Sequence, residues 1–190
     1  METGPVCTCW PGATVWITGL PSAGKTTIAD TLAKRLRRSG RRVEVLDGDQ
    51  IRACLSPGLG FSREDRHTHV RRVGMMAEVL ARNDVLTLVP VIAPYADSRA
   101  AVRARHHRSG TRFLEVHVAT PVEVCARRDV KGLYARRSAG EISALTGVDD
   151  PYEAPDDPDL VIAAHQQDVD ASVAALHELL TTKGLAWPPR

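Results

Sequence analysis

The stretch Gly19-Leu20-Pro21-Ser22-Ala23-Gly24-Lys25-Thr26 decides the fold of this chain. It matches the pattern G-x-x-x-x-G-K-[ST], it follows the apolar run Val15-Trp16-Ile17, and a helical pattern begins at Thr27. Strand, glycine loop and helix in this order form the setting in which the pattern binds nucleotide phosphates. The sequence therefore predicts a phosphate-binding loop (P-loop) at residues 19–26.

The residue types of this loop suit a phosphate group. Gly19 and Gly24 permit backbone angles that a Cβ would forbid, so successive N–H groups can converge on an anion at a helix N-terminus. We expect Lys25 to reach the β- and γ-phosphates of ATP and the Thr26 hydroxyl to hold Mg²⁺. The alternative is a glycine turn with an incidental lysine, which the flanking strand and helix disfavour. The other loop residues expected to contact the nucleotide are Ser22, Ala23 and Thr27.

Length and composition bound the class of protein. The 190 residues suit one domain over 1–190 with a short tail at 1–12, and 43% apolar with 25% charged residues is ordinary for a globular protein. The net charge of +2 is too small to argue for nucleic acid or membrane, and no apolar run approaches about 18 residues. We expect a cytoplasmic protein without nucleic-acid or membrane partners and without a zinc site. Cys7 and Cys9 indicate free thiols more than a redox pair.

Strand-like and helix-like segments alternate along the chain. We expect strands at 13–18, 43–46, 85–92, 113–118 and 160–164, and helices at 25–38, 51–55, 62–82, 97–107, 121–128 and 169–180. Ser62 with Asp65 forms the expected N-cap of the third helix. This alternation predicts an α/β fold with a doubly wound, five-stranded parallel sheet and helices on both faces.

Two other parts of this pattern stand out. Residues from about 129 to 158 lack clean periodicity, and a stretch this long indicates a lid, with surface decoration as the alternative. Arginine dominates the basic residues. A solvated helix face is expected for a group near the first helix: Arg35, Arg37, Arg38, Arg41 and Arg42.

Two carboxylates follow the second expected strand, in Asp47-Gly48-Asp49. Ligands of such sheets bind beyond the carboxyl ends of the strands, so both aspartates should face the P-loop. The chain lacks the Asn-Lys-x-Asp strand end of guanine-specific GTPases, and the run 85–92 ends in Ala93-Pro94-Tyr95 without the carboxylate of motor or transport ATPases. The pattern favours a small-molecule kinase; a turn with two solvated aspartates is the alternative.

Further motifs resemble the adenylylsulfate (APS) kinase family, in one order and spacing from about residue 13 to 165. They are residues 19–27, 46–49 with Ile51-Arg52, 59–66, Arg71-Arg72, Pro94-Tyr95, 123–125, 129–134, 140–142 and 146–153. The resemblance implies a P-loop kinase, commonly a homodimer, that moves the γ-phosphoryl group of ATP to the ribose 3′-hydroxyl of APS. The products would be PAPS and ADP.

The resemblance also implies roles for individual residues near the donor phosphates. Asp49 is the candidate to orient the attacking hydroxyl and to accept its proton, and Asp47 would act on Mg²⁺ through a bound water. Lys131, on the lid, would close over the phosphates and touch the substrate. Arg128 would lie near the adenine of ATP.

On the acceptor side, Arg52 and Arg66 match substrate-binding arginines of the family and would hold the phosphosulfate by bidentate contacts. Phe61 would stack on the adenine of APS. The remaining residues expected at the substrate are His69, Ile92 and Leu145.

The sequence departs from the family pattern mainly in this acceptor half. His69, in Thr68-His69-Val70, stands where the family has an asparagine that contacts APS, and Ala93-Pro94-Tyr95-Ala96 replaces Ser-Pro-Tyr-Arg. Leu145 replaces one of two aromatic rings that sandwich the adenine. Two alternatives therefore stay open: a related kinase retuned to another nucleotide or metabolite hydroxyl, and a non-catalytic nucleotide-binding module, against which the intact P-loop argues.

Overall fold

The computed structural model describes residues 10–188, and within them the chain forms five strands and seven helices. In chain order they are β1 (Ala13–Thr18), α1 (Lys25–Arg38), β2 (Val43–Val45), α2 (Gly48–Leu55), α3 (Arg63–Ala81), β3 (Leu86–Pro90), α4 (Ala96–Arg108), β4 (Arg112–Val118), α5 (Val122–Arg128), α6 (Leu133–Ser138), β5 (Leu160–Ile162) and α7 (Val169–Thr182). The expectation for Cys7 and Cys9 falls outside the described residues. No helix within 10–188 has the length and apolar character needed to cross a membrane.

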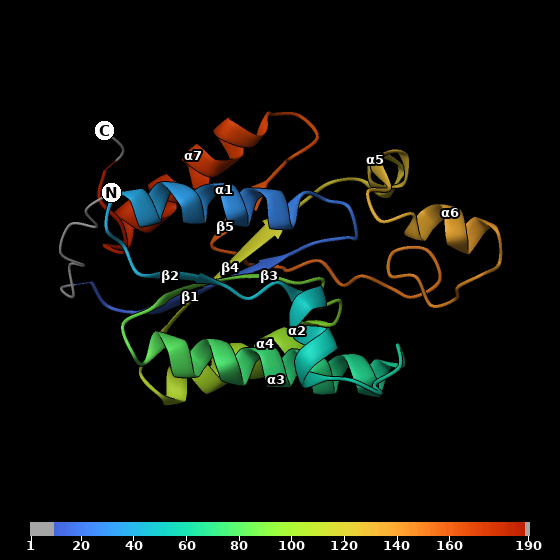
Figure 1. The fold of residues 1–190 in the computed structure, drawn as a ribbon, viewed down its shortest axis with the longest axis horizontal. Coiled ribbons are helices and arrows are strands. Elements are labelled where there is room, and N and C mark those ends of the chain that lie inside the picture. Colours follow the sequence, from blue (N-terminus) through green and yellow to red (C-terminus); the bar gives the residue numbers. More distant parts are fainter. Residues whose placement is uncertain (1–9, 189–190) are drawn as a thin grey trace.

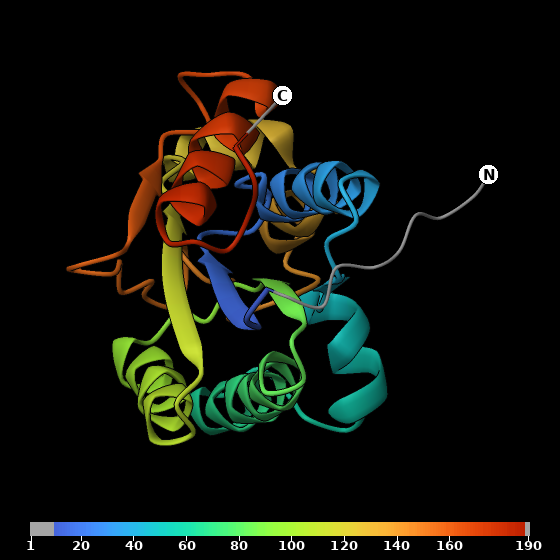
Figure 2. The same ribbon diagram turned by 90° about the vertical axis from the view of Figure 1, so that its left-hand side faces the viewer.

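The strands form one parallel sheet in the order β2-β3-β1-β4-β5. Val15, on the central strand β1, lies opposite Leu88 of β3 and Leu114 of β4. Helices α1 and α7 cover one face of the sheet, and α2, α3 and α4 lie on the other (Figure 1). Figure 2, turned by 90°, shows the same layers with the sheet between them. The predicted doubly wound parallel α/β fold is confirmed.

The central strand feeds both layers of the core because successive side chains of a strand point to opposite faces. Val15 and Ile17 pack into the cluster beneath α1 and α7 with Leu32, whereas Trp16 packs into the cluster beneath α3 and α4 with Val73. Every residue of β1 is buried. A strand covered on both faces is apolar without alternation, which is why the run 13–18 was readable from sequence.

Two helix starts are set by side-chain caps. Asp47 caps α2, accepting hydrogen bonds from the backbone N–H of Asp49 (3.0 Å) and Gln50 (3.3 Å), so α2 begins at Gly48 and not near residue 51 as expected. Ser62 Oγ accepts from the N–H of Asp65 at 3.1 Å, as its sequence position predicts. Aspartate and serine stabilise helix N-termini because they pair otherwise free N–H groups.

Arg41 corrects the expectation of a fully solvated arginine group. Its side chain is buried, and it donates to the carbonyl oxygens of Pro11 (2.7 Å), Asp84 (3.2 Å) and Leu185 (3.3 Å). These carbonyls come from three distant segments, so the contact could not be seen in local pattern. Burial lowers the pKa of Arg41, although the guanidinium stays charged.

Candidate active site

The P-loop turns tightly between β1 and α1. Gly19 has φ 152°, and a Cβ there would lie 2.6 Å from the carbonyl oxygen of Val118. Gly24 has φ 107° in the left-handed region and occupies the N-cap position of α1. A side chain would strain the backbone at Gly24 and clash at Gly19, so both glycines are required by the geometry of the loop.

A cavity of about 600 Å³ lies at the carboxyl ends of the strands, over the P-loop. Its lining includes most residues predicted for the site: Ser22, Ala23, Gly24, Lys25, Thr26, Thr27, Asp47, Asp49, Arg52, Phe61, Arg66, His69, Ile92, Arg128 and Lys131. Gly19 and Leu145 are not among the lining residues. Gly19 lies at the end of β1, close to the carbonyl oxygen of Val118. Leu145, 6% exposed, packs in the core cluster with Ala23 and Leu133.

Lys25 is held against its own loop. Its Nζ donates to the carbonyl oxygens of Gly19 (2.9 Å) and Leu20 (2.7 Å), and the side chain is only 8% exposed. Burial lowers the pKa of Lys25 to about 8, against smaller opposing effects that include the charges of Asp49 and Asp47. Its ammonium is therefore preorganised at the floor of the cavity, and an entering anion would favour its protonated form.

Hydroxyl and carboxylate oxygens gather beside the P-loop. Thr26 Oγ1 donates to Asp47 Oδ2 at 2.9 Å, and the other carboxylate oxygen of Asp47 caps α2. Such oxygens are the ligands that Mg²⁺ prefers, together with phosphates and water. Within residues 10–188 there is no group of three or more His, Cys, Asp and Glu side chains able to hold a metal ion by itself. The donor set thus fits a cation that arrives with a phosphate ligand.

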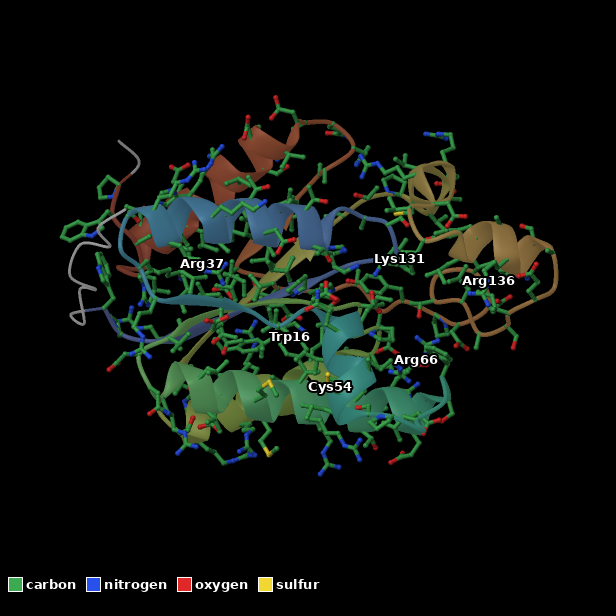
Figure 3. The ribbon with its side chains drawn as sticks, viewed as in Figure 1. Trp16, Arg37, Cys54, Arg66, Lys131 and Arg136 are labelled. Carbon is green, nitrogen blue, oxygen red and sulfur yellow. The ribbon has the colours of Figure 1, made fainter. Side chains whose placement is uncertain are left out.

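The segment 129–158, expected to be a lid and called the lid segment from here on, lines the cavity through Val130, Lys131 and Leu133. Lys131 forms an ion pair with Asp49, and both side chains are more than half exposed. Figure 3 shows Lys131 beside the N-terminal end of α1, near the P-loop. This contact joins residues 82 positions apart in the chain and places the lid lysine directly at the candidate base.

The acceptor side carries an exposed aromatic ring between two arginines. Phe61 is 58% exposed, and the guanidinium carbons of Arg52 and Arg66 lie 4.6 and 5.6 Å from its ring centroid. An open ring of this kind offers a stacking surface to a flat ligand. The arrangement brings together three of the residues that the family resemblance assigned to APS.

Arg66 is tied to the lid. It donates through Nε to Phe61 O (2.8 Å), through Nη1 to Thr146 Oγ1 (2.7 Å), and through Nη2 to Ala144 O (2.5 Å) and Asp150 Oδ2 (3.2 Å). These contacts engage four of the five N–H groups of a guanidinium. Arg66 is thus a link between α3 and the segment 144–150, and Figure 3 shows it at the N-terminal part of α3.

His69 lines the acceptor side as a neutral group. It is 5% exposed, and its Nδ1 lies 3.0 Å from Ser56 Oγ. Burial, and then the positive charge of Arg52, lower the pKa of His69 to about 4. At neutral pH the ring can therefore offer a hydrogen bond but no charge.

At the far end of the cavity sequence reasoning found only Arg128 and missed the other lining residues: Val130, Leu133, Ala164, Gln167, Asp168, Val169 and Ser172. Arg128, which was predicted there, donates to Ala23 O (3.3 Å) and Ala164 O (2.7 Å) and so spans the P-loop and the turn after β5. The lining residues between 164 and 172 could have been found from the sequence, because they follow the carboxyl end of the parallel strand β5, where ligands of such sheets bind.

The site combines a glycine loop at a helix N-terminus, a buried lysine, two carboxylates and a lysine on the lid segment. These features define a P-loop phosphotransferase. The model of the adenylylsulphate kinase family matches residues 11–163. The chain belongs to the adenylylsulfate kinase family.

Individual relatives agree with this assignment. The chain is 51% identical over 169 residues to a probable adenylyl-sulfate kinase of Synechocystis sp., covering 89% of this chain and 93% of that protein. The Mycobacterium tuberculosis APS kinase CysC, solved in complex with AMPPNP and APS, has a TM-score of 0.87 and 42% identity, over 90% of this chain and 98% of that one. A hexameric APS kinase from Thiobacillus denitrificans gives a TM-score of 0.71 and 32% identity, over 96% of this chain and 31% of that one.

Proposed function

We propose that this protein transfers the γ-phosphoryl group of ATP to the 3′-hydroxyl of adenylylsulfate, giving PAPS and ADP. One observation carries the proposal: a single cavity runs from Arg128, across the P-loop, to Asp49, Arg52 and Phe61. A cavity lined in this way would bring two nucleotides together over one phosphate site. The related M. tuberculosis enzyme was solved with such a pair, AMPPNP and APS.

Phosphoryl transfer depends on alignment and charge neutralisation more than on covalent help. The P-loop N–H groups and Lys25 would hold the β- and γ-phosphates. Asp49 would orient the 3′-hydroxyl and take its proton as the oxygen attacks the γ-phosphorus and the bond to the β-phosphate oxygen breaks. Lys131 would leave its ion pair with Asp49 and follow the lid onto the transferred group, exchanging one anionic partner for another.

Thr26 and Asp47 would hold Mg²⁺, with Asp47 acting through a bound water. The donor set supports this because both oxygens already face each other at 2.9 Å beside the P-loop. When bound, the cation neutralises the charge that develops on the β- and γ-phosphates.

Phe61 and Arg52 would bind the acceptor, Phe61 by stacking on its adenine and Arg52 through the phosphosulfate. Stacking of this kind is worth roughly 1–3 kcal/mol per base. His69 and Ile92 would complete the wall, His69 as an uncharged hydrogen-bonding partner. Arg66 would contribute its remaining N–H and hold the lid segment 144–150, and Leu145 would support that segment from the core.

The test is a product assay with purified protein, ATP, Mg²⁺ and APS. We expect PAPS and ADP in equal amounts, and we expect poor turnover of other hydroxyl acceptors. Turnover of another nucleotide or metabolite without PAPS formation would favour a retuned kinase. Binding of ATP with no turnover of any acceptor would favour a non-catalytic module. No feature of the relatives supports either alternative.

We also propose that the protein is a homodimer working in the cytoplasm. The family resemblance supports the dimer, although the Thiobacillus relative is hexameric. The cytoplasm supplies the ATP that the reaction consumes. Sedimentation equilibrium on the purified protein separates one, two and six copies, and fractionation of the source cells gives the compartment.

A further inference from the structure

The end of the cavity near α7 presents apolar side chains and a guanidinium group, a lining that suits a flat aromatic ring. Val130 and Val169 line it, and their side chains are 79% and 41% exposed. Arg128 lies nearby, because its Nη2 donates to the carbonyl oxygen of Ala164, which lines the same end of the cavity. Apolar side chains and a guanidinium plane are the surfaces on which a nucleobase stacks.

Most polar side chains at this end already have partners within the protein. Arg128 donates to Ala23 O and Ala164 O, as described above. The carboxylate of Asp168 caps α7, accepting from the N–H of Ala171 at 2.7 Å. Ser172 Oγ donates to the carbonyl oxygen of Asp168 at 2.9 Å. These groups hold the segment in place and are engaged in doing so.

Gln167 is oriented by this arrangement. Its Nε2 donates to Ser172 Oγ at 3.0 Å. Ser172 donates its hydroxyl proton to the carbonyl oxygen of Asp168, so its oxygen can only accept a hydrogen bond from Gln167. The group of Gln167 that lies at Ser172 is therefore the carboxamide nitrogen and not the carboxamide oxygen. The carboxamide keeps its oxygen and its second N–H for a ligand.

We propose that Gln167 determines the base specificity of the nucleotide site and selects adenine over guanine; the proposal rests on the proposed use of this end for the phosphoryl donor. A glutamine carboxamide can pair with adenine by two hydrogen bonds, accepting from the exocyclic N6 amino group and donating to a ring nitrogen. Guanine presents the acceptor O6 where adenine has the N6 donor. The oxygen of Gln167 would then face another oxygen, and the pair would be lost.

The test is titration calorimetry with non-hydrolysable ATP and GTP analogues in the presence of Mg²⁺. We expect the wild-type protein to bind the ATP analogue at least tenfold more tightly. Gln167→Leu should weaken ATP-analogue binding about tenfold while leaving GTP-analogue binding nearly unchanged, since one good bidentate pair discriminates between bases by at least this factor. Ser172→Ala, which frees the carboxamide to rotate, should lower the preference by a smaller factor.

Gln166→Leu is the matched control, because Gln166 is an exposed neighbour that does not line the cavity. It should leave both affinities unchanged. A preference that survives Gln167→Leu, or an equal loss for both analogues, would overturn the assignment. These titrations contain no APS, so a wrong acceptor would leave them intact, whereas failure to bind any nucleotide would defeat the proposed function itself.

Discussion

At the scale of single residues, the site contains a lysine ammonium whose pKa is lowered by burial. Lys25 is almost fully buried, with its ammonium on two carbonyl oxygens and its pKa lowered to about 8. A lysine in water has a pKa near 10.4, so at about 8 the Lys25 side chain lies much closer to the pH at which it loses its charge. Its protonation state should therefore govern nucleotide binding in mildly alkaline solution.

We expect ATP affinity to fall as the pH rises from 7 to 9. Below about 8 the ammonium is present to pair with the triphosphate; above it, binding must first restore a proton, which weakens binding progressively. Calorimetry with Mg²⁺ and the ATP analogue in two buffers of different ionisation enthalpy should show proton uptake near pH 8. Lys25→Met should bind more weakly and without this pH dependence. Equal pH slopes in the two proteins would contradict the assignment.

Asp49 has a different task from Lys25, because its proposed role arises only as the acceptor hydroxyl reacts. Asp49→Asn should lower kcat by on the order of 100-fold or more, the range typical of a lost general base, with ATP affinity changed less than about threefold. Steady-state kinetics and direct titration give the two quantities. Asp47→Asn is the comparison, and we expect it to raise the Mg²⁺ concentration needed for activity. A parallel loss of kcat and ATP affinity in Asp49→Asn would remove its role in the chemistry.

At the scale of elements, the proposed acceptor residues Arg66 and His69 depend for their position on the close packing of α3 against α4. Gly74 lies in the middle of α3, where a Cβ would come within 2.6 Å of Val102 Cγ2 and 2.8 Å of its Cγ1. The absence of a side chain lets the two helices approach. The N-terminal half of α3 carries Arg66 and His69, so this packing also sets the position of the site.

Gly74→Ala should lower the free energy of unfolding. Alanine in place of glycine normally stabilises a helix by about 1 kcal/mol, but overpacking at this contact costs roughly 1–3 kcal/mol and is expected to prevail. Urea denaturation measures the difference. Val102→Ala makes room for the added methyl group, so the double variant should be more stable than the sum of the single effects. Strict additivity would show that the two side chains do not meet.

The lid is a second element whose position is set by a few contacts. Arg66 binds Ala144, Thr146 and Asp150, and the ion pair of Lys131 with Asp49 holds the lid at the other side of the cavity. In addition, the ideal Cβ position of Gly147 lies 2.5 Å from Leu20 Cδ2, so the lid turn packs on the P-loop itself. Helix α3, the lid segment and the phosphate loop are thus connected by direct contacts.

At the scale of the whole molecule, the cavity joins the two sides of the sheet. Its lining comes from α1 and the start of α7 on one side and from α2 and α3 on the other, with the lid between them. A ligand that fills the cavity therefore contacts segments from most of the chain. Binding should stabilise the molecule as a unit, because ligand affinity for the native state alone adds to the free energy of unfolding.

Mg²⁺ with the ATP analogue should raise the thermal midpoint. At about 100 times the dissociation constant the added stability is about 2.7 kcal/mol, which corresponds to a rise of roughly 5–10 °C for a chain of this size. Differential scanning calorimetry measures the shift. EDTA should remove most of it, and Lys25→Met should show little. A shift that is unaffected by EDTA would contradict the magnesium site of Thr26 and Asp47.

Much of the fold was predictable because its signals are local. The alternation of strands and helices, the buried central strand and the cap at Ser62 all follow from neighbouring residues, and the structure confirms them. The P-loop and the Asp47-Gly48-Asp49 turn were placed at the carboxyl edge of the sheet, where both line the cavity. Some element ends shifted, as when the cap at Asp47 started α2 early, and α6 (Leu133–Ser138) formed within the stretch 129–158, where no helix was predicted.

The sequence alone determined the doubly wound sheet, through the alternation of strand-like and helix-like segments along the chain. It also determined the phosphate loop and the carboxylates that face it, because each of these motifs lies within a few consecutive residues. Only the tertiary structure decided that Arg41 is buried, that Arg66 holds the lid, that Leu145 packs in the core and that Gln167 lines the cavity. Arg66 and Asp150 are 84 positions apart. Such contacts arise from the way distant segments meet over the sheet, and no local period of the chain records them.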